Sequence, residues 1–182
     1  HIRLAIVARI TPVKDHLTLL KALVILQREL SEQDIPQLAI VGDGEQRVAL
    51  ESYCQTNQLN SVRFLGARDD VAQIIAETDI FVLSSLAEGI PMTILEAMSG
   101  KTAVVSTNVG GIPEVVTDGV EGFLVDKSNP EALAKAIRTY INKPRLITEH
   151  GEQARERIVN HFNEKNMVQA YLHEYNVLLG KG

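Results

Sequence analysis

The amino-acid sequence predicts a doubly wound α/β domain, in which a Rossmann-like parallel sheet of about six strands carries helices on both faces. Short apolar runs alternate with amphipathic stretches along the chain, which is the order of repeated strand–helix–strand units. The runs are rich in valine, isoleucine and leucine and show little polar alternation, as strands covered on both faces do. The chain has 182 residues, a length that favours a single domain.

Six apolar runs are predicted to be the strands of this sheet. They are Ile2–Arg9, Gln37–Gly42, Val62–Gly66, Ile80–Ser84, Ala103–Thr107 and Gly122–Val125. In open sheets of this class, ligands bind outside the carboxyl ends of the strands. The segments that directly follow these runs are therefore where we expect the chemistry of the protein.

Helices are predicted between the strands, because apolar residues recur there at helical spacing. The clearest stripes are Leu19, Leu23, Leu26 and Leu30; Leu50, Tyr53 and Cys54; and Leu133, Ala136, Ile137, Tyr140 and Ile141. From about Pro144 onward the sequence predicts a helical C-terminus with no further strand.

The last predicted helix, Glu164–Leu179, carries two adjacent apolar stripes. One stripe consists of Met167, Tyr171 and Leu178, and the other of Val168, Leu172, Tyr175 and Leu179. A helix that lies on one sheet face needs only a single stripe. We therefore expect this surface to be partly exposed in the domain and covered in a full-length protein; the alternative is a helix buried wholly within the domain.

The composition excludes several classes of protein. A formal net charge of −5 argues against general nucleic-acid binding, which needs a basic face, although a small anionic ligand can still bind in a basic pocket. The single cysteine, Cys54, cannot form an internal disulfide, and no apolar run is long enough for a membrane span. No signal peptide is visible and the chain opens directly in a strand-like run, so we expect part of a longer cytoplasmic protein.

Two familiar nucleotide-binding motifs do not fit. Gly42-Asp43-Gly44 follows a predicted strand, but the dinucleotide pattern needs glycine where Arg47 stands, so a strand-to-helix turn is the better interpretation. Gly100-Lys101-Thr102 resembles the end of a P-loop. However, the first glycine of that motif would fall at Leu95, and the segment joins a helix to a strand, which is the reverse order.

The segment Glu88–Met98 predicts an anion site at the start of a helix. Pro91 suits the first turn of a helix, where a missing N–H group has no cost. Gly89 lets the backbone bend tightly and lets a ligand approach closely. With the helix dipole, free N–H groups at such a start form a site fit for phosphate. Those groups belong to Ile90, Met92 and Thr93.

Two glutamates frame this helix start. Glu96 lies about a turn and a half inside the helix, where its carboxylate can accept two hydrogen bonds from a vicinal diol such as a ribose. Glu88 precedes the helix and can reach a different part of the same ligand. For any single pair of glutamates, the alternative is one solvated residue and one ordinary helix residue.

A second candidate segment, Arg9–His16, follows the first predicted strand. Arg9 closes an apolar run at the carboxyl edge of the sheet, and Lys14 stands just before the first helix. Two cations in one loop can neutralise a diphosphate, although taken alone they could be ordinary surface residues. No Asp-x-Asp occurs, and the five histidines lack metal-ligand spacing, so we expect no bound metal. We interpret His16, His150 and His161 as surface residues.

The third candidate segment is Asn108–Glu114, which follows the strand that ends at Thr107. The pair Gly110-Gly111 before Ile112-Pro113 indicates a tight turn and another helix start. The segment is either a simple turn or a wall of the same cleft, and the residues alone leave both open.

Taken together, these segments resemble a known family. Glu88 through Glu96 forms a Glu-x7-Glu motif that continues as Ala97-Met98, with the Arg9 and Lys14 pair upstream and Val109–Glu114 downstream. Val41–Gly44 and Arg63–Gly66 lie between them, in the expected order. Over essentially its whole length, the chain resembles the C-terminal, nucleotide-sugar-binding half of a group 1, family 4 glycosyltransferase. These are retaining enzymes of the two-domain GT-B architecture.

The resemblance assigns a role to each matching residue. It implies that Arg9 and Lys14 bind the diphosphate and stabilise the leaving nucleotide, and that Glu88 contacts hydroxyls of the donor sugar. It implies that Glu96 holds the ribose diol. The backbone of the segment Gly89, Ile90, Pro91, Met92 and Thr93 would cradle sugar and phosphates. The base would be flanked by the turn from Gly66 to Arg68 and by Val71.

The sequence also departs from the family pattern. The glycine that usually precedes the arginine is Ala8, and the glycine after the lysine is Asp15. A carboxylate at Asp15 either weakens the hold of Lys14 on phosphate or caps the following helix. Lys101 stands where a left-handed glycine would help the chain turn, and we expect Gly100 to take up part of that strain.

The reaction implied by the resemblance moves a sugar from a UDP-, GDP- or ADP-sugar donor to an acceptor, with retention at the anomeric carbon and with no cofactor or metal. In the family the acceptor domain precedes this one, so the expected partner is that N-terminal domain, and this chain alone should bind donor without transferring it. Any peripheral membrane association would come through that other half. The alternatives are another GT-B sugar-nucleotide enzyme, such as an epimerase, and a non-catalytic nucleotide-sugar-binding module. The residues do not reveal the base, the sugar or the acceptor.

Overall fold

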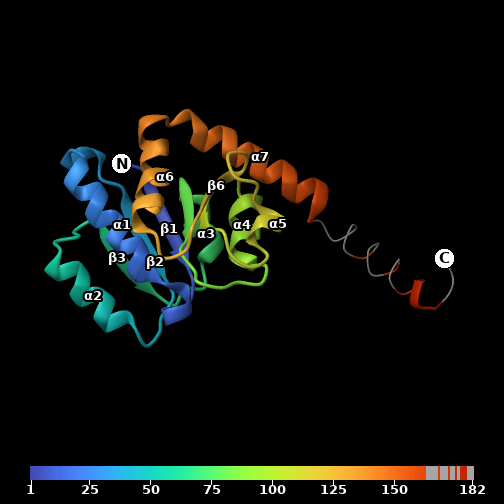
Figure 1. Ribbon diagram of the computed structural model, residues 1–182, viewed down its shortest axis with the longest axis horizontal. Coiled ribbons are helices and arrows are strands. Elements are labelled where there is room, and N and C mark those ends of the chain that lie inside the picture. Colours follow the sequence, from blue (N-terminus) through green and yellow to red (C-terminus); the bar gives the residue numbers. More distant parts are fainter. Residues whose placement is uncertain (163–167, 169–171, 173–174, 176, 180–182) are drawn as a thin grey trace.

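The structure is a computed structural model that describes residues 1–162, 168, 172, 175 and 177–179. In this part of the chain, six strands form one parallel sheet, which confirms the predicted fold class (Figure 1). The strands are β1 (Arg3–Val7), β2 (Gln37–Val41), β3 (Val62–Gly66), β4 (Ile80–Leu83), β5 (Ala103–Thr107) and β6 (Gly122–Val125). Their order is β3-β2-β1-β4-β5-β6, the order of a doubly wound Rossmann-type sheet.

The first predicted strand is too long at both ends, and its carboxyl end matters for the site. β1 stops at Val7, so Ala8 and Arg9 lie in the following loop and not in the sheet. The Ala8 amide still donates to the Val41 carbonyl at 3.0 Å, but the chain then follows the loop after β2, where the Ile10 amide donates to the Asp43 carbonyl at 2.9 Å. Arg9 is therefore beyond the carboxyl end of β1, as its expected role requires.

Helices cover both faces of the sheet. They are α1 (His16–Glu29), α2 (Arg47–Thr56), α3 (Val71–Ala76), α4 (Met92–Ser99), α5 (Ile112–Val115), α6 (Pro130–Asn142) and α7 (Arg145–His161), with short 3-10 turns η1 (Pro12–Lys14) and η2 (Glu32–Asp34). Right-handed crossovers place α1 and α2 on one face and α3 and α4 on the other. α6 packs along α1, and α7 packs against α4 (Figure 1).

The core lies between these layers, and its distribution follows strand position. Every residue of β4 and β5 is buried, because helices cover these central strands on both faces. β3 is an edge strand and alternates between half-buried and exposed residues. The Gly42-Asp43-Gly44 segment forms the strand-to-helix turn that leads to α2, which agrees with the rejection of a dinucleotide motif.

The turn between α4 and β5 corrects one prediction. Gly100 has an ordinary φ of −83°, whereas Lys101 itself adopts the left-handed conformation with φ of 62°. α7 packs directly on this turn: a Cβ atom at Gly151 would lie 2.1 Å from the Lys101 carbonyl oxygen. Gly151 therefore allows the close approach of the helix, and this packing holds Lys101 in a conformation that L-residues rarely adopt.

Two of the three histidines that were predicted at the surface are buried. His16 lies in the first turn of α1 with its side chain inside the core, and neither ring nitrogen has a hydrogen-bond partner among the described residues. His150 faces inward from α7, where its Nδ1 lies 2.7 Å from the Tyr140 hydroxyl and its ring meets Phe123 edge-on. The prediction was wrong because both helices turn these positions toward the sheet. His161 is exposed, as predicted.

The apolar stripes of the C-terminal segment fall partly outside the described residues. Met167 and Tyr171 are outside them, whereas the described members of the stripes are exposed: Val168, Leu172, Tyr175, Leu178 and Leu179. Their coverage in a longer protein stays a prediction. Within the part of the chain that the structure describes, no helix combines the length and apolar character that crossing a membrane requires.

Candidate functional site

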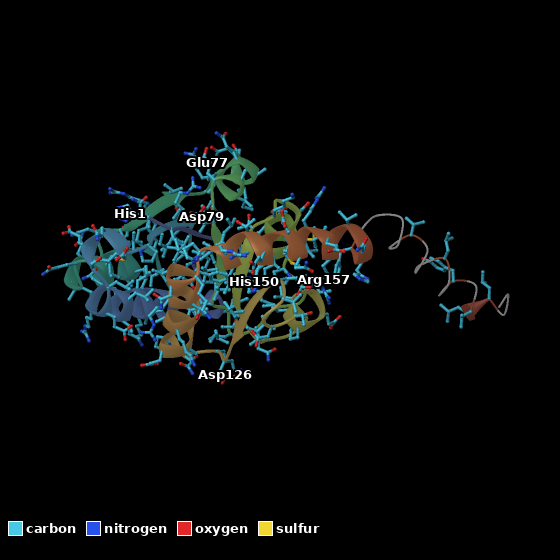
Figure 2. The ribbon with its side chains drawn as sticks, turned by 90° about the horizontal axis from the view of Figure 1, so that it is seen from above. His1, Glu77, Asp79, Asp126, His150 and Arg157 are labelled. Carbon is cyan, nitrogen blue, oxygen red and sulfur yellow. The ribbon has the colours of Figure 1, made fainter. Side chains whose placement is uncertain are left out.

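The site is built where the strand order of the sheet reverses. β1 pairs in parallel with β4 at the centre of the sheet, with Leu4 beside Ile80 and Ala5 beside Phe81. The chain leaves these two strands in opposite directions, so a crevice opens between the loops at their carboxyl ends. Figure 2 shows the two ends of the strands. Asp126 follows β6 and marks the carboxyl edge of the sheet, and it lies on the opposite side of the molecule from Asp79, which precedes β4 at the amino edge.

The two loops meet in an ion pair between Lys14 and Glu88. The Lys14 Nζ donates to Glu88 Oε1 at 2.6 Å, although the residues are 74 positions apart in the chain. Their side chains are only 24% and 8% exposed. The loops are tied together by two further bonds: the Leu86 amide donates to the Val13 carbonyl at 2.8 Å, and the Ser84 hydroxyl donates to the Asp15 carbonyl at 2.9 Å. The sequence placed both charges at this edge but did not predict their contact.

The ion pair shapes the electrostatics of the site. Lys14 and Glu88 neutralise each other, so Lys14 adds no unpaired positive charge to the loop after β1. Arg9 is exposed in the loop after β1, and its guanidinium has no hydrogen-bond or ion-pair partner among the described residues. An anion at this edge would meet Arg9 and could draw Lys14 away from Glu88, because phosphate and carboxylate compete for the same ammonium group.

Asp15, which replaces the usual glycine of the family, caps the helix that follows it. Its backbone has φ of 45°, the left-handed conformation that aspartate tolerates better than most residues. Its Oδ1 accepts from the Thr18 amide at 3.3 Å, and its Oδ2 accepts from the Thr18 hydroxyl at 2.7 Å. Of the two roles considered for this carboxylate, capping is the one that the structure shows.

The start of α4 leaves backbone N–H groups available. α4 begins at Met92, and Pro91, which was predicted in the first turn, is instead its extended N-cap with no side-chain cap. The amides of the first turn have no partner within the helix. Gly89 and Ile90 are exposed, and a Cβ atom at Gly89 would meet nothing within 4 Å. The space in front of this helix start is therefore open to a ligand.

The loop after β5 forms a wall of the same site, which decides between the two interpretations of that segment. The Gly111 amide donates to the Gly89 carbonyl at 3.0 Å. Gly110 has φ of 55°, and a Cβ atom there would lie 1.7 Å from the Glu88 carbonyl oxygen. Only glycine permits this contact, and the loop thereby fixes the backbone of the segment that carries Glu88.

A cavity of about 430 Å³ lies between these loops. It is lined by Glu88 and by residues of the loops after β4, β5 and β6, among them Asn108, Asp126 and Lys127. Asp126 and Lys127 were not predicted as site residues. The signal that could have found them is positional, because both directly follow the sixth predicted strand at the carboxyl edge of the sheet.

The remaining predicted residues lie along the same edge. Glu96 is exposed on α4, Gly66 ends β3, and Val71 begins α3. Arg68 is engaged by Asp70 through two hydrogen bonds, of 2.8 and 2.6 Å. β2 and β1 lie between β3 and β4, so two strands separate the residues assigned to the base from those assigned to the sugar.

Sequence reasoning missed the buried hydroxyls beneath Glu88. The Ser85 hydroxyl donates to Glu88 Oε1 at 2.6 Å, and the Thr107 hydroxyl donates to the Ser85 carbonyl at 2.6 Å. Both side chains are buried. A usable signal existed: Thr107 ends one predicted strand and Ser85 directly follows another, and buried polar groups at such places are hydrogen-bonded.

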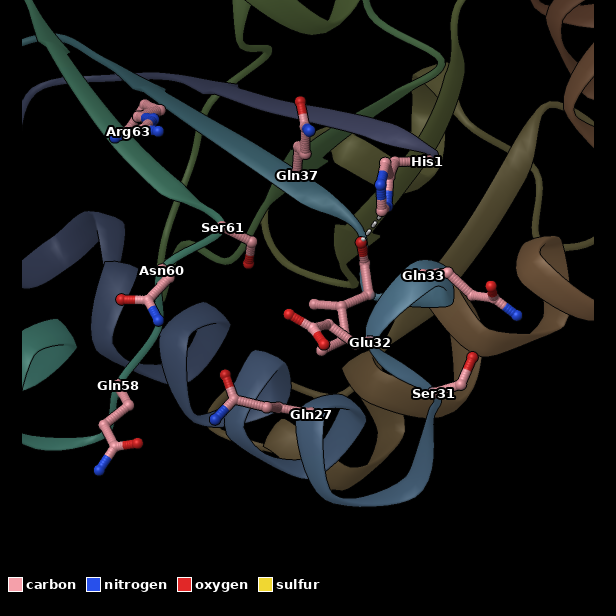
Figure 3. A pocket seen from close by; sticks show the side chains of 11 residues that line it. His1, Gln27, Ser31, Glu32, Gln33, Gln37, Gln58, Asn60, Ser61 and Arg63 are labelled. Atoms are coloured by element: carbon pink, nitrogen blue, oxygen red, sulfur yellow. Dashed lines mark hydrogen bonds between the residues drawn. The ribbon is translucent and has the colours of Figure 1, made fainter.

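A second, larger groove of about 860 Å³ lies at the opposite edge of the sheet (Figure 3). Its lining is mostly amide and hydroxyl side chains, including Gln27, Gln58, Asn60 and Ser61. Gln27 lies in the last turn of α1 and Gln58 just follows α2, and helix C-termini carry a partial negative charge that disfavours anions. Although Arg63 and the N-terminal His1 also line this groove, its described lining residues offer a diphosphate no start of an α-helix such as that of α4.

Metal ligands are also sparse. Within the described residues, no three histidine, cysteine, aspartate or glutamate side chains are grouped so that they could hold a metal ion. The expectation of a metal-free diphosphate site rests on the sequence, and it stays a prediction.

Comparison with known proteins identifies the family. Residues 2–157 match the family described as "Glycosyl transferases group 1". The chain belongs to the group 1 glycosyltransferases. The resemblance found in the Glu-x7-Glu segment and its flanking loops is thereby confirmed for the greater part of the chain.

Individual relatives agree with this membership. The chain is 31% identical over 136 residues, 74% of its length, to N-acetyl-alpha-D-glucosaminyl L-malate synthase of Bacillus anthracis. It is 31% identical over 160 residues, 86% of its length, to UDP-Gal:alpha-D-GlcNAc-diphosphoundecaprenol alpha-1,3-galactosyltransferase of Escherichia coli. Crystal structures of HepE from Anabaena, with UDP and glucose and with UDP-glucose, match 96% of this chain at 26% and 28% identity, with TM-scores of 0.85 and 0.82.

The chain spans less than half the length of these relatives. It corresponds to 36% of the Bacillus anthracis protein, 41% of the Escherichia coli protein and 48–49% of the Anabaena protein. The shared fold of this group 1 glycosyltransferase therefore accounts for one part of such proteins.

We predict that His16 makes the folded protein sensitive to acid. Burial, and to a smaller extent the nearby Lys14 charge, lowers the pKa of His16 from 6.5 to about 4. Between these pH values the unfolded chain binds a proton that the folded chain does not, so stability falls as the pH drops from 6.5 to 4, by up to about 3 kcal/mol. His16→Gln should flatten this dependence in urea unfolding experiments.

The exposed His161→Gln variant is the matched control and should keep the wild-type dependence on pH. His150, whose pKa burial also lowers, contributes in the same direction in all three proteins and cancels in the comparison. Identical pH profiles for His16→Gln and His161→Gln would contradict the prediction.

Proposed function

We propose that this group 1 glycosyltransferase domain binds a nucleoside-diphosphate sugar and presents it for transfer to an acceptor, with retention at the anomeric carbon. The observation that carries the proposal is the convergence of Lys14, Glu88 and the uncapped start of α4 at the reversal point of the sheet. These elements supply a cation, a hydrogen-bond acceptor and backbone donors within one crevice. A sugar diphosphate needs all three.

The diphosphate would lie between the loop after β1 and the start of α4. Arg9 and Lys14 are the cations of that loop, and both can bind phosphate oxygens. The amides of Met92 and Thr93, with the dipole of α4, would bind the same group from the other side. Since neither source of charge is a metal, binding should need no divalent ion.

From the diphosphate, the sugar and the nucleoside would extend in opposite directions along the carboxyl edge of the sheet. Glu88, beside the cavity bounded by the loops after β5 and β6, would bind hydroxyls of the donor sugar. Glu96 would hold the ribose diol, and the base would lie toward the turn from Gly66 to Arg68 and Val71. The Anabaena relative of the same fold has been crystallised with UDP and with UDP-glucose, which supports this class of ligand.

The chemistry required of the domain is electrostatic. Breaking the bond between the sugar and the diphosphate leaves negative charge on the phosphate, and Arg9, Lys14 and the start of α4 would stabilise it. The leaving phosphate oxygen would help to remove the proton of the acceptor hydroxyl. We infer that the acceptor is held by an N-terminal domain of the full-length protein, so this domain alone should bind donor and transfer nothing.

We expect calorimetric titration in excess chelator to show binding of one nucleoside diphosphate and its sugar nucleotide. The panel consists of UDP with UDP-glucose, GDP with GDP-mannose, and ADP with ADP-glucose. Binding that is lost on chelation and restored by magnesium would contradict the charge assignment. Failure to bind any pair, with or without magnesium, would contradict the proposed function.

We further predict that the two glutamates act on different parts of the ligand. Glu96→Ala should weaken binding of nucleoside diphosphate and sugar nucleotide alike, because both contain the ribose. Glu88→Ala should weaken binding of the sugar nucleotide only. Loss of a charged hydrogen-bond partner predicts about a tenfold effect or more. Glu152→Ala, an exposed glutamate on α7, is the control, and equal losses for both ligands in both variants would contradict the division of roles.

A further inference from the structure

The carboxylate of Glu88 is anchored through one oxygen only. Both of its hydrogen bonds, from Lys14 Nζ and from the Ser85 hydroxyl, reach Oε1 at 2.6 Å. The other oxygen, Oε2, has no hydrogen-bond partner among the described residues. The group is therefore held at one end and available at the other, which is the arrangement needed to offer a single acceptor atom to a ligand hydroxyl.

The two donors to Oε1 differ in how firmly they are fixed. Lys14 ends a long flexible side chain, and its ammonium is also a natural partner for phosphate. Ser85 has a short side chain that is fully buried two residues after the end of β4. Its carbonyl oxygen accepts a hydrogen bond of 2.6 Å from the hydroxyl of Thr107, the buried last residue of β5. The backbone that carries the short Ser85 side chain is thus tied to β5, whereas the long Lys14 side chain has more rotatable bonds through which it can reorient.

This difference matters when a diphosphate competes for Lys14. If the ammonium turns to the phosphate, Glu88 loses its charged partner but keeps the Ser85 hydroxyl. A hydrogen bond to a charged group in a buried site is strong enough to hold one rotamer of a side chain. Oε1 therefore stays in place, and Oε2 keeps its direction.

We propose that Ser85 is a positioning residue for the donor sugar, and that it acts through Glu88. Its hydroxyl holds Oε1, so that Oε2 is the oxygen offered to a sugar hydroxyl while Lys14 is released to the diphosphate. The inference rests on the proposed sugar-nucleotide function and extends it by one residue that does not itself touch the ligand.

The test uses the natural full-length protein and the same calorimetric panel. For the pair that binds, Ser85→Ala should lower the affinity for the sugar nucleotide by about tenfold. The affinity for the matching nucleoside diphosphate should stay within about twofold of wild type. Ser106→Ala is the matched control, because Ser106 is also a fully buried serine, on β5, but its hydroxyl bonds the Leu83 carbonyl and not Glu88. It should bind both ligands as wild type does.

A double variant separates a positioning role from a structural one. Because Ser85 acts through Glu88, Ser85→Ala combined with Glu88→Ala should bind the sugar nucleotide no more weakly than Glu88→Ala alone. Thr107→Val, which removes only the hydroxyl that fixes the Ser85 carbonyl, should shift affinity in the same direction by a smaller factor. This variant tests the inference even if Ser85→Ala fails to fold.

The outcomes distinguish this inference from the function on which it rests. If the wild-type protein binds no pair of the panel, the proposed function is wrong and this inference falls with it. If the wild-type protein binds but Ser85→Ala matches Ser106→Ala, the inference alone is wrong. Equal weakening of nucleoside diphosphate and sugar nucleotide, or full additivity of Ser85→Ala with Glu88→Ala, would also overturn it.

Discussion

The parallel pairing of β1 with β4 is the constraint on which the site depends. The paired residues Leu4 and Ile80 are 76 positions apart in the chain, yet they lie side by side at the centre of the sheet. Because parallel strands end at the same edge, the loops that follow them must meet. The contact of Lys14 with Glu88 follows directly from this pairing, and no local feature of either loop would produce it.

The polar groups of the site are supported by the sheet beneath them. The hydroxyls of Ser84, Ser85 and Thr107 are buried at strand ends and bond to the backbone or to Glu88. The loop after β5 adds a backbone contact through Gly110 and Gly111. A binding group held in this way loses little conformational freedom when a ligand arrives, which is how preorganised sites gain affinity.

Prediction from the sequence was most accurate for features that depend on a single physical rule. Apolar runs located all six strands, three of them to the residue, because covered parallel strands need uniformly apolar side chains. Arg9, Lys14 and Glu88 were placed at one sheet edge because they lie at or after the ends of predicted strands, and parallel strands end at the same edge. The burial of His16 could not be predicted from the sequence, since a single histidine in the first turn of a helix can face either the core or the solvent. The left-handed Lys101 and the Ser85 contact depend on distant partners, Gly151 and Glu88, which only the folded chain brings near.

A crystal structure of this domain with its sugar nucleotide bound is the most direct measurement. The diphosphate should lie within hydrogen-bond distance of Lys14 and of the first-turn amides of α4, with Glu88 Oε2 on a sugar hydroxyl. A ligand bound instead in the groove at the opposite edge, against Gln27 and Asn60, would contradict the claim that the reversal of strand order builds the site.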